Sequence, residues 1–179
     1  MDSKNLIIRE SVFDDCVFFG KWEQMPSVTE FFAIDEGRGY EQIVTEFIRN
    51  KLDPTKAQFT IVLKETNEPI GRIYITRIDT HYDSLDITRI YIADPELRNK
   101  GYGEEAIRNI LDYAFINRHM ERVTIDHFMK NKPAAHLYEK IGFTNEGILR
   151  NAVKKDGKYY DLQLKSMLRS EYYNRHHTD

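Results

Sequence analysis

The segment Arg98-Asn99-Lys100-Gly101-Tyr102-Gly103 lies between a run that predicts a strand and a run that predicts a helix. Glycine lacks a Cβ atom, so the backbone at these positions can approach a ligand closely and expose its N–H groups. A helix that begins directly afterwards favours an anion, through its unpaired N–H groups and its dipole. The segment therefore predicts a pyrophosphate-binding turn, to which Arg98 and Lys100 add charge. A glycine-rich connection that merely turns the chain is the alternative.

Two other phosphate motifs compete for this segment. Gly101, Gly103 and Ala106 match a dinucleotide fingerprint, and Asp126 at the end of a predicted strand could serve as its ribose-binding acid. That fingerprint follows a strand directly and usually opens a domain, whereas here residues 94–100 intervene and several elements come first. A Walker loop is excluded, because no Gly-Lys-Ser/Thr follows.

Outward from this turn, the chain predicts one α/β (α+β) domain. Apolar residues recur every three to four positions over 103–118, which is typical of a helix with one buried face. Consecutive strands on both sides of a single βαβ unit argue against a doubly wound parallel sheet. We expect a single domain over 1–172 and a mobile C-terminal tail over 173–179. The expected elements are strands over 6–9, 59–64, 70–78, 85–93, 122–128, 148–153 and 159–168, and helices over 11–24, 40–52, 103–118 and 133–141.

Composition narrows the class of protein. The 179 residues include 26 Lys and Arg, 29 Asp and Glu, and one cysteine, Cys16. A lone cysteine excludes an internal disulfide and CxxC metal or redox motifs, and favours a reduced, cytoplasmic setting. A net charge of −3 argues against a nucleic-acid partner. No apolar run is long enough for a transmembrane helix, no secretory signal is expected, and the histidines do not have metal-site spacing.

Charge is unevenly distributed along the chain. Acids outnumber bases 11 to 7 over residues 1–60, and bases outnumber acids 11 to 8 over residues 121–179. This asymmetry suits a cationic substrate near acids within 23–46 and an anionic cofactor near Arg98, Lys100, Lys130 and Lys132. Ordinary scatter of solvated charges is the alternative.

Two motifs together resemble the GNAT superfamily of acetyl-CoA-dependent N-acetyltransferases, most strongly over residues 87–143. The family's pyrophosphate loop, Arg/Gln-x-x-Gly-x-Gly/Ala, is matched by Arg98, Gly101 and Gly103. A second segment of the family is matched by Asn131, Ala134, Tyr138, Gly142 and Phe143. The closing residues 146–162 resemble the branch that holds ribosomal-protein and spermidine acetyltransferases.

The resemblance implies a GNAT fold: a mixed, mostly antiparallel seven-stranded sheet, with helices on both faces and an opening between the fourth and fifth strands. It also implies acetyl-CoA as co-substrate and no metal. Glu104 departs from the family pattern, since a carboxylate there would repel a nearby diphosphate unless it turns aside. The implied cofactor contacts are the backbone of Tyr91, Ile92 and Ala93, the N–H groups of Arg98, Asn99, Lys100, Gly101, Tyr102 and Gly103, and the side chains of Asn131 and Tyr138.

Acetyl transfer to an amine needs a base, a site for the acyl oxygen and a proton for the departing thiolate. We expect Asp126 to be the base, because some family members carry an acid at the matching place, while a solvated or capping Asp126 is the alternative. The Ile92 N–H could polarise the thioester carbonyl, and Tyr138 could protonate the thiolate; a tyrosine of the core is the alternative for Tyr138. Cys16 is expected to be a small buried hydrophobe, so direct attack by the amine is favoured.

The function expected from the sequence is acetylation of a primary amine, with a small cationic amine of the polyamine or aminoglycoside type favoured. Glu30, Glu36 and Asp86 are further candidates for the base or for holding a cationic substrate. Protein N-terminal acetylation and a non-catalytic acyl-CoA sensor are the alternatives, and a nicotinamide oxidoreductase is a more distant one. The expected partner is a small-molecule amine or a protein N-terminus, without a membrane or nucleic acid, and a homodimer is left open.

Overall fold

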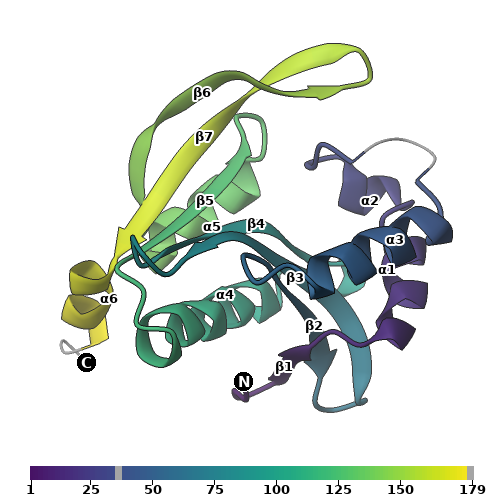
Figure 1. The fold of residues 1–179 in the computed structure, drawn as a ribbon, viewed down its shortest axis with the longest axis horizontal. Coiled ribbons are helices and arrows are strands. Elements are labelled where there is room, and N and C mark those ends of the chain that lie inside the picture. Colours follow the sequence, from purple (N-terminus) through teal and green to yellow (C-terminus); the bar gives the residue numbers. More distant parts are fainter. Residues whose placement is uncertain (35–37, 177–179) are drawn as a thin grey trace.

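The computed structural model describes residues 1–34 and 38–176. Within these residues seven strands form one open sheet in the order β1-β2-β3-β4-β5-β7-β6 (Figure 1). Of the neighbouring pairs, β4 and β5 are parallel and the others are antiparallel. The predicted mixed, mostly antiparallel seven-stranded sheet is thus confirmed. The strands are β1 (Leu6–Glu10), β2 (Ala57–Leu63), β3 (Glu68–Asp79), β4 (Ser84–Ile92), β5 (Arg122–Phe128), β6 (Thr144–Lys155) and β7 (Lys158–Leu168).

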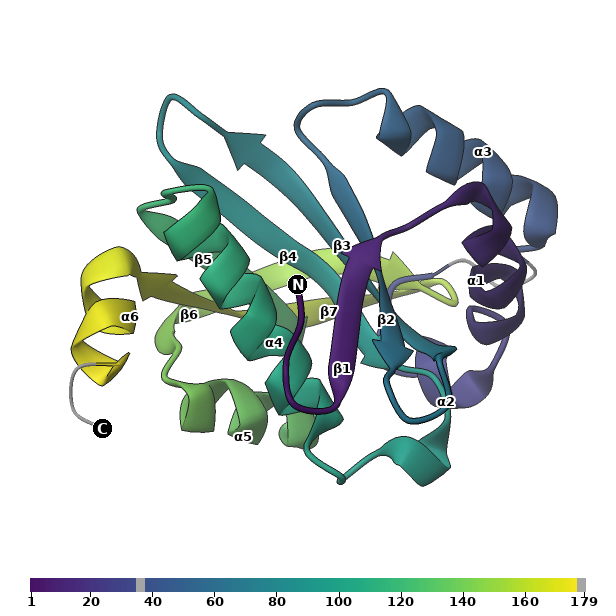
Figure 2. The same ribbon diagram turned by 90° about the horizontal axis from the view of Figure 1, so that it is seen from below.

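Helices lie on both faces of this sheet, as predicted. α4 and α5 cover one face, and α1 and α3 cover the other (Figures 1 and 2). None of the helices within the described residues is both long and apolar enough to cross a membrane. The α-helices are α1 (Cys16–Trp22), α2 (Pro26–Thr29), α3 (Tyr40–Lys51), α4 (Tyr102–Asp112), α5 (Lys132–Ile141) and α6 (Arg169–His176).

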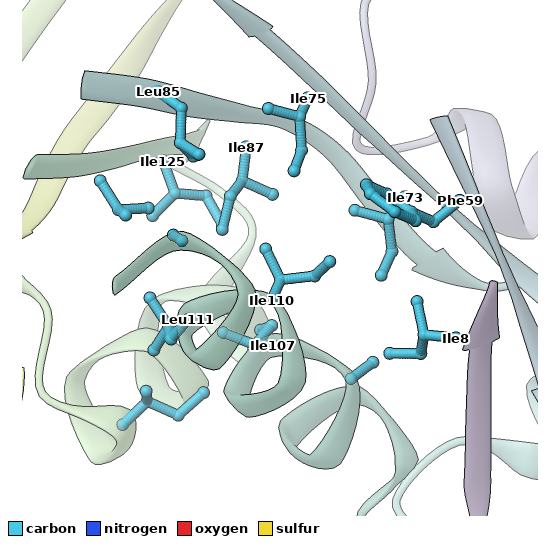
Figure 3. Packing of buried hydrophobic residues seen from close by; sticks show 14 of the residues in the cluster. Ile8, Phe59, Ile73, Ile75, Leu85, Ile87, Ile107, Ile110, Leu111 and Ile125 are labelled. Atoms are coloured by element: carbon cyan, nitrogen blue, oxygen red, sulfur yellow. The ribbon is translucent and has the colours of Figure 1, made fainter. Parts of the chain in front are cut away.

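The larger core lies between the sheet and α4. Alternate residues of a strand face the same side of a sheet, and the buried stripe of α4 packs against one such set of isoleucine and leucine side chains. Figure 3 shows the two sets facing each other across the layer. The labelled members are Ile8, Phe59, Ile73, Ile75, Leu85, Ile87, Ile107, Ile110, Leu111 and Ile125.

A second, smaller core lies on the opposite face, under α1 and α3. It joins apolar side chains of these helices to Tyr91 and Ala93 at the end of β4 and just after it. Because alternation along β4 sends Ile92 to the first core and Tyr91 to the second, the end of this strand is held from both faces. The helical contributors are Cys16, Phe19, Trp22, Val28, Ile43 and Phe47.

The first helical region, expected over 11–24, starts differently in the structure. The Ser11 hydroxyl is buried against Thr60, and the Asp15 carboxylate accepts from the Val12 N–H at 2.8 Å. A short 3-10 turn, η1 (Phe13–Asp15), therefore precedes α1. The side chain of Asp15 also forms an ion pair with Arg9 of β1, so a contact distant in sequence outweighs the local capping signal.

The chain is helical into part of the expected tail, because α6 extends to His176. α6 packs on the turn η3 (Tyr113–Asn117), where the Tyr172 ring lies 4.9 Å from that of Phe115, and the Tyr172 hydroxyl donates to Asp112 at 2.6 Å. Residues 173–176 of the expected tail continue this helix. The remaining residues of that tail, 177–179, lie outside the described residues.

The hairpin of β6 and β7 extends past the rest of the sheet and curves toward α2 (Figure 1). Its turn is formed by Asp156 and Gly157, both with positive φ, which is the pattern of a type I′ hairpin. Near the turn, the Lys155 ammonium donates to the carbonyl of Thr29 at the end of α2. The hairpin and α2 therefore meet over the end of β5.

Candidate active site

The sheet opens between β4 and β5. Their parallel pairing runs from Ser84–Arg122 to Ile87–Ile125 and ends there, although β4 continues to Ile92. The Ala93 N–H donates to Ile70 of β3 at 2.9 Å, so by alternation the preceding N–H, that of Ile92, points into the opening. The predicted opening between the fourth and fifth strands is therefore present, with an unpaired strand edge on one side.

The glycine turn lies at the start of α4, next to this opening. Gly101 has φ of +85° and occupies the N-cap position without a side-chain hydrogen bond. The N–H groups of a helix's first turn have no partner within the helix, and none is recorded among the described residues for those of Asn99 to Gly103. A Cβ atom at Gly103 would meet only Leu137, at 3.7 Å. Because packing does not require glycine there, the space it leaves suits a ligand.

Arg98, at the start of the glycine turn, makes several hydrogen bonds to backbone carbonyls. Its N–H donates to the Pro95 carbonyl at 3.1 Å, and its guanidinium donates to the carbonyls of Ile92, Ala93 and Ser27 at 3.2, 3.3 and 2.9 Å. These contacts occupy the backbone N–H, Nε and Nη2 of Arg98, and its positive charge stays beside the glycine turn. Arg98 ties the end of β4 to the glycine turn and to α2.

Glu104 follows the turn, and its carboxylate faces away from the diphosphate position. It accepts from Arg108 at 2.9 Å and pairs with Lys140 of α5. The hydrogen bond from Lys140, followed by that from Arg108, holds the pKa of Glu104 below its usual value. The positive charges of Arg108 and Lys140 therefore offset the negative charge of Glu104. This weakens the repulsion that we expected between Glu104 and a diphosphate.

Helix α5 carries both residues of the second motif that were expected to contact the cofactor. Asn131 caps the helix, its Oδ1 accepting from the Ala134 N–H at 3.2 Å, and no partner is recorded for its Nδ2 within the described residues. Tyr138 lies two turns further on and is buried, with its ring 5.8 Å from His127 and 5.9 Å from Phe143. Burial raises the pKa of the Tyr138 phenol above its usual range, and the negative charge of Asp126 raises it further. The phenol is therefore protonated at neutral pH.

Asp126 lies on β5 just past the last residue that pairs with β4. Burial, then the negative charge of Asp86, raises its pKa to about 6, and Arg77 opposes this shift. No hydrogen-bond partner is recorded for its carboxylate within the described residues. The structure thus brings Asp126 within electrostatic reach of Tyr138, with the unpaired edge of β4 across the opening.

The other acids proposed from the sequence are differently placed. Asp86 is buried and accepts from Thr88 at 2.8 Å and Thr124 at 2.7 Å, and pairs with Arg77 at 2.8 Å. These partners hold the Asp86 side chain between β3 and β5. Glu30 is exposed, and Glu36 lies outside the described residues.

A buried charge cluster behind β4 was not found by sequence reasoning. Glu23 at the end of α1 accepts from Arg72 at 2.6 Å, Arg89 at 2.9 Å and the Tyr91 hydroxyl at 3.3 Å. Glu46 of α3 pairs with the same two arginines and with Arg38. These acids were expected to face a cationic substrate, but their ion pairs assign them to the scaffold. One feature of the sequence could have indicated this cluster: Arg72 occupies an inward-facing position in an otherwise apolar strand.

The described residues hold no group of three or more His, Cys, Asp or Glu that could bind a metal. Cys16 is buried in the second core, and burial raises the pKa of its thiol. A protonated, buried thiol is a weak nucleophile. The arrangement at the opening therefore offers a protonated phenol, a carboxylate and an unpaired strand edge rather than a covalent nucleophile.

The chain is similar to known N-acetyltransferases over most of its length. A probable N-acetyltransferase of Bacillus subtilis, YjcK, is 33% identical over 131 residues, which are 73% of this chain and 71% of the relative. The spermidine N(1)-acetyltransferase of Vibrio cholerae is 24% identical over 173 residues, covering 97% of this chain and 98% of the relative.

A solved structure has the same fold. The spermidine N-acetyltransferase from Vibrio cholerae, in complex with CoA and spermine, aligns with a TM-score of 0.86 at 23% identity, covering 95% of this chain and 99% of that one. Residues 5–144 match the family model described as an acetyltransferase (GNAT) domain. With this match across most of its length, the chain belongs to the GNAT acetyltransferase family.

Proposed function

We propose that this protein transfers the acetyl group of acetyl-CoA to a small cationic primary amine, by direct attack of the amine within a ternary complex. Family membership supports acetyl-CoA as the donor. The relative that acts on spermidine supports an acceptor of the polyamine type. The carboxylate of Asp126 at the opening is compatible with an acceptor of positive charge.

The residues present fit acetyl-CoA. The unpartnered N–H groups of residues 99–103 would hold its pyrophosphate, because a helix N-terminus at a glycine turn binds anions. The unpaired edge of β4 and the Nδ2 of Asn131 would hold the cofactor arm. When bound, acetyl-CoA supplies an acyl group activated as a thioester.

Asp126 would take the proton of the attacking amine. An alkylamine with a pKa of about 10.4 is mostly protonated at pH 7, whereas a carboxyl group with a pKa of about 6 is mostly ionised. The Asp126 carboxylate would first remove one proton from the bound ammonium and release it to solvent, which frees the nitrogen lone pair for attack. As the nitrogen–carbon bond forms and the carbon–sulfur bond breaks, the carboxylate would receive the second proton that leaves the nitrogen. A base with a pKa close to the working pH suits this step.

Tyr138 and Ile92 would serve the other two reacting atoms. The Tyr138 phenol would give its proton to the departing sulfur, and it regains one from solvent or from Asp126. The N–H of Ile92 would donate to the acyl oxygen as negative charge develops there. The observation that carries the proposal is the unpaired edge of β4 next to the glycine turn, with Asp126 just past the last residue of β5 that pairs with β4.

Thermal unfolding with each nucleotide tests the donor. At about 100 times its Kd, acetyl-CoA should add about 2.7 kcal/mol to the free energy of unfolding. For a chain of this size this raises Tm by roughly 5–10 °C. NAD at the same concentration should leave Tm unchanged. The reverse pattern would exclude the proposed donor.

Release of free thiol from acetyl-CoA tests the acceptor. The panel contains diamines and polyamines, an aminoglycoside, and a peptide with a free N-terminus. Turnover with the cationic small molecules and none with the peptide is the expected result. Turnover with the peptide alone would indicate protein N-terminal acetylation. Binding of acetyl-CoA without turnover of any amine would indicate an acyl-CoA sensor.

A further inference from the structure

The ammonium of Lys130 lies among three aromatic rings. Its Nζ is 5.9 Å from the ring centroid of Phe31, 6.0 Å from that of Phe128 and 5.8 Å from that of Tyr160. Each distance is within the range of about 6 Å at which a cation interacts with an aromatic face. The sequence grouped Lys130 with the cations around the cofactor, but the structure places it in this aromatic cage, formed by Phe31, Phe128 and Tyr160.

The cage is assembled by segments that are distant in sequence. Phe31 follows α2, Phe128 ends β5 and Tyr160 lies on β7. Phe128 is buried and meets Tyr160 edge to face, with centroids 5.3 Å apart. The bond from Lys155 to Thr29 joins the hairpin to α2 beside it. Phe128 and Tyr160 are therefore held together by a contact that does not involve Lys130.

Lys130 itself is weakly held. Its side chain is exposed, and within residues 1–34 and 38–176 no carboxylate forms an ion pair with it. A cage that holds an ammonium through ring faces alone can exchange it for another ammonium at little cost, because the two ions make the same contacts. Lys130 thus occupies a site whose chemistry suits any alkylammonium.

The cage lies beside the candidate base. Asp126 and Phe128 are two residues apart on β5, so their side chains leave the same face of the strand about 7 Å apart. That separation is close to the length of a short alkyl chain between two amino groups. An acceptor whose reacting amine is at Asp126 can therefore place a second ammonium at the rings.

On the basis of the proposed function, we propose that this cage binds the second ammonium of a diamine acceptor and that Lys130 is the internal occupant which the acceptor displaces. A monoamine has no group to enter the cage and leaves Lys130 in place. The cage therefore selects for acceptors with two cationic groups separated by a short alkyl chain.

The cage is tested by comparing two acceptors of the same chain length, 1-aminobutane and 1,4-diaminobutane, in the acetylation reaction with acetyl-CoA. In Tyr160→Leu the ratio of kcat/KM for the diamine to that for the monoamine should fall roughly three- to tenfold, since one ring face is lost. Tyr160→Phe keeps the ring and should keep the ratio. Tyr159→Leu is the matched control, because Tyr159 is exposed on the same strand and has its own lysine, Lys154, at 5.5 Å.

A measurement without turnover separates this inference from the proposed function. Ring currents from the three aromatic side chains should shift the NMR signals of the Lys130 side chain. These signals are assigned to Lys130 because they are absent in Lys130→Arg. Saturating 1,4-diaminobutane should return these signals toward those of a lysine that lies away from aromatic rings, and 1-aminobutane should not. The proposed binding of the second ammonium would be wrong if Tyr160→Leu left the diamine-to-monoamine ratio of kcat/KM unchanged. It would also be wrong if the diamine did not shift the Lys130 signals. If wild-type protein acetylates none of the amines in the wider panel, the proposed function fails, and the NMR titration with the two amines still tests whether a diamine displaces Lys130.

Discussion

The Asp126 carboxyl combines two properties that rarely occur together at a protein surface. It is partly buried next to a second carboxylate, which raises its pKa to about 6, and no hydrogen bond from the described residues stabilises its charged form. Burial of a charge without a partner costs stability, so its position is better explained by chemistry than by folding. At neutral pH it carries a charge that the folded protein would be more stable without.

Replacing this residue should therefore change activity and stability in opposite directions. Asp126→Asn should lower kcat/KM by roughly 10²- to 10⁴-fold, the contribution of a general base. The folded-state pKa is above the unfolded value, so the ionised carboxyl destabilises the fold at pH above about 6, and this cost disappears as the pH falls. Asn removes the cost, and urea unfolding at pH 7.5 should show a gain of about 1–3 kcal/mol.

The pH profile supplies the control for this variant. In wild-type protein kcat/KM should fall as the pH drops below about 6, where Asp126 becomes protonated. Tyr138→Phe should lower kcat at every pH but leave this limb in place, because it removes the proton donor and not the base. An Asp126→Asn variant with full activity and the same limb would show that another group accepts the proton.

At the scale of elements, the two glycines of the turn before α4 do different things. Gly101 adopts φ of +85°, which an L-residue rarely takes, so the turn itself requires glycine. Gly103 lies within the helix, where a Cβ atom would make an ordinary contact with Leu137. Helical glycine is less stable than alanine by about 0.5–1 kcal/mol, so Gly103 weakens the isolated element.

This difference predicts a separation of stability from ligand affinity. Gly103→Ala should raise the free energy of unfolding by up to about 1 kcal/mol and weaken acetyl-CoA binding roughly tenfold, since its methyl group would displace the phosphate from a backbone donor. Gly101→Ala should lower stability by about 1–2 kcal/mol. Isothermal titration and urea unfolding measure the two quantities. Unaltered affinity in Gly103→Ala would remove the pyrophosphate from this turn.

The elements that the sequence predicted are those with strong local signals. The periodicity of α4 and the turn residues around β6 and β7 identify these elements without tertiary information. α2 has four residues, too few for periodicity, and α6 is polar along its length, so both form through contacts that the sequence does not display. The sequence did not predict the hydrogen bond from Arg98 to the Ser27 carbonyl, because the two residues are 71 positions apart.

At the scale of the whole molecule, one buried cluster joins the layer of α1 and α3 to the sheet. Arg72 is fully buried on β3, where Glu23 and Glu46 neutralise it and the ring of Phe19 lies 4.3 Å from its guanidinium. Glu23 and Arg72 are 49 residues apart, which is why sequence reasoning assigned the acids of this region to a substrate. Removing one partner from such a pair leaves the other charge buried and unpaired.

Loss of this pairing should be costly. Glu23→Gln should lower the free energy of unfolding by about 3–5 kcal/mol, measured by urea unfolding at pH 7. Glu41→Gln is the matched control, because Glu41 is an exposed acid on α3, and it should change stability by less than about 0.5 kcal/mol. Equal effects in the two variants would mean that the cluster does not hold the helical layer to the sheet.

The opening between β4 and β5 has a consequence for hydrogen exchange. The amides of Ile90 and Ile92 lie in the middle strand of the sheet, and their N–H groups point away from β3 into the opening. They should exchange with deuterium much faster than the amide of Tyr91 between them, which points to β3. A cofactor arm that pairs with this edge would slow both amides and leave Tyr91 unaffected. The exchange rates of successive amides along β4 therefore report whether the acetyl-CoA site is occupied.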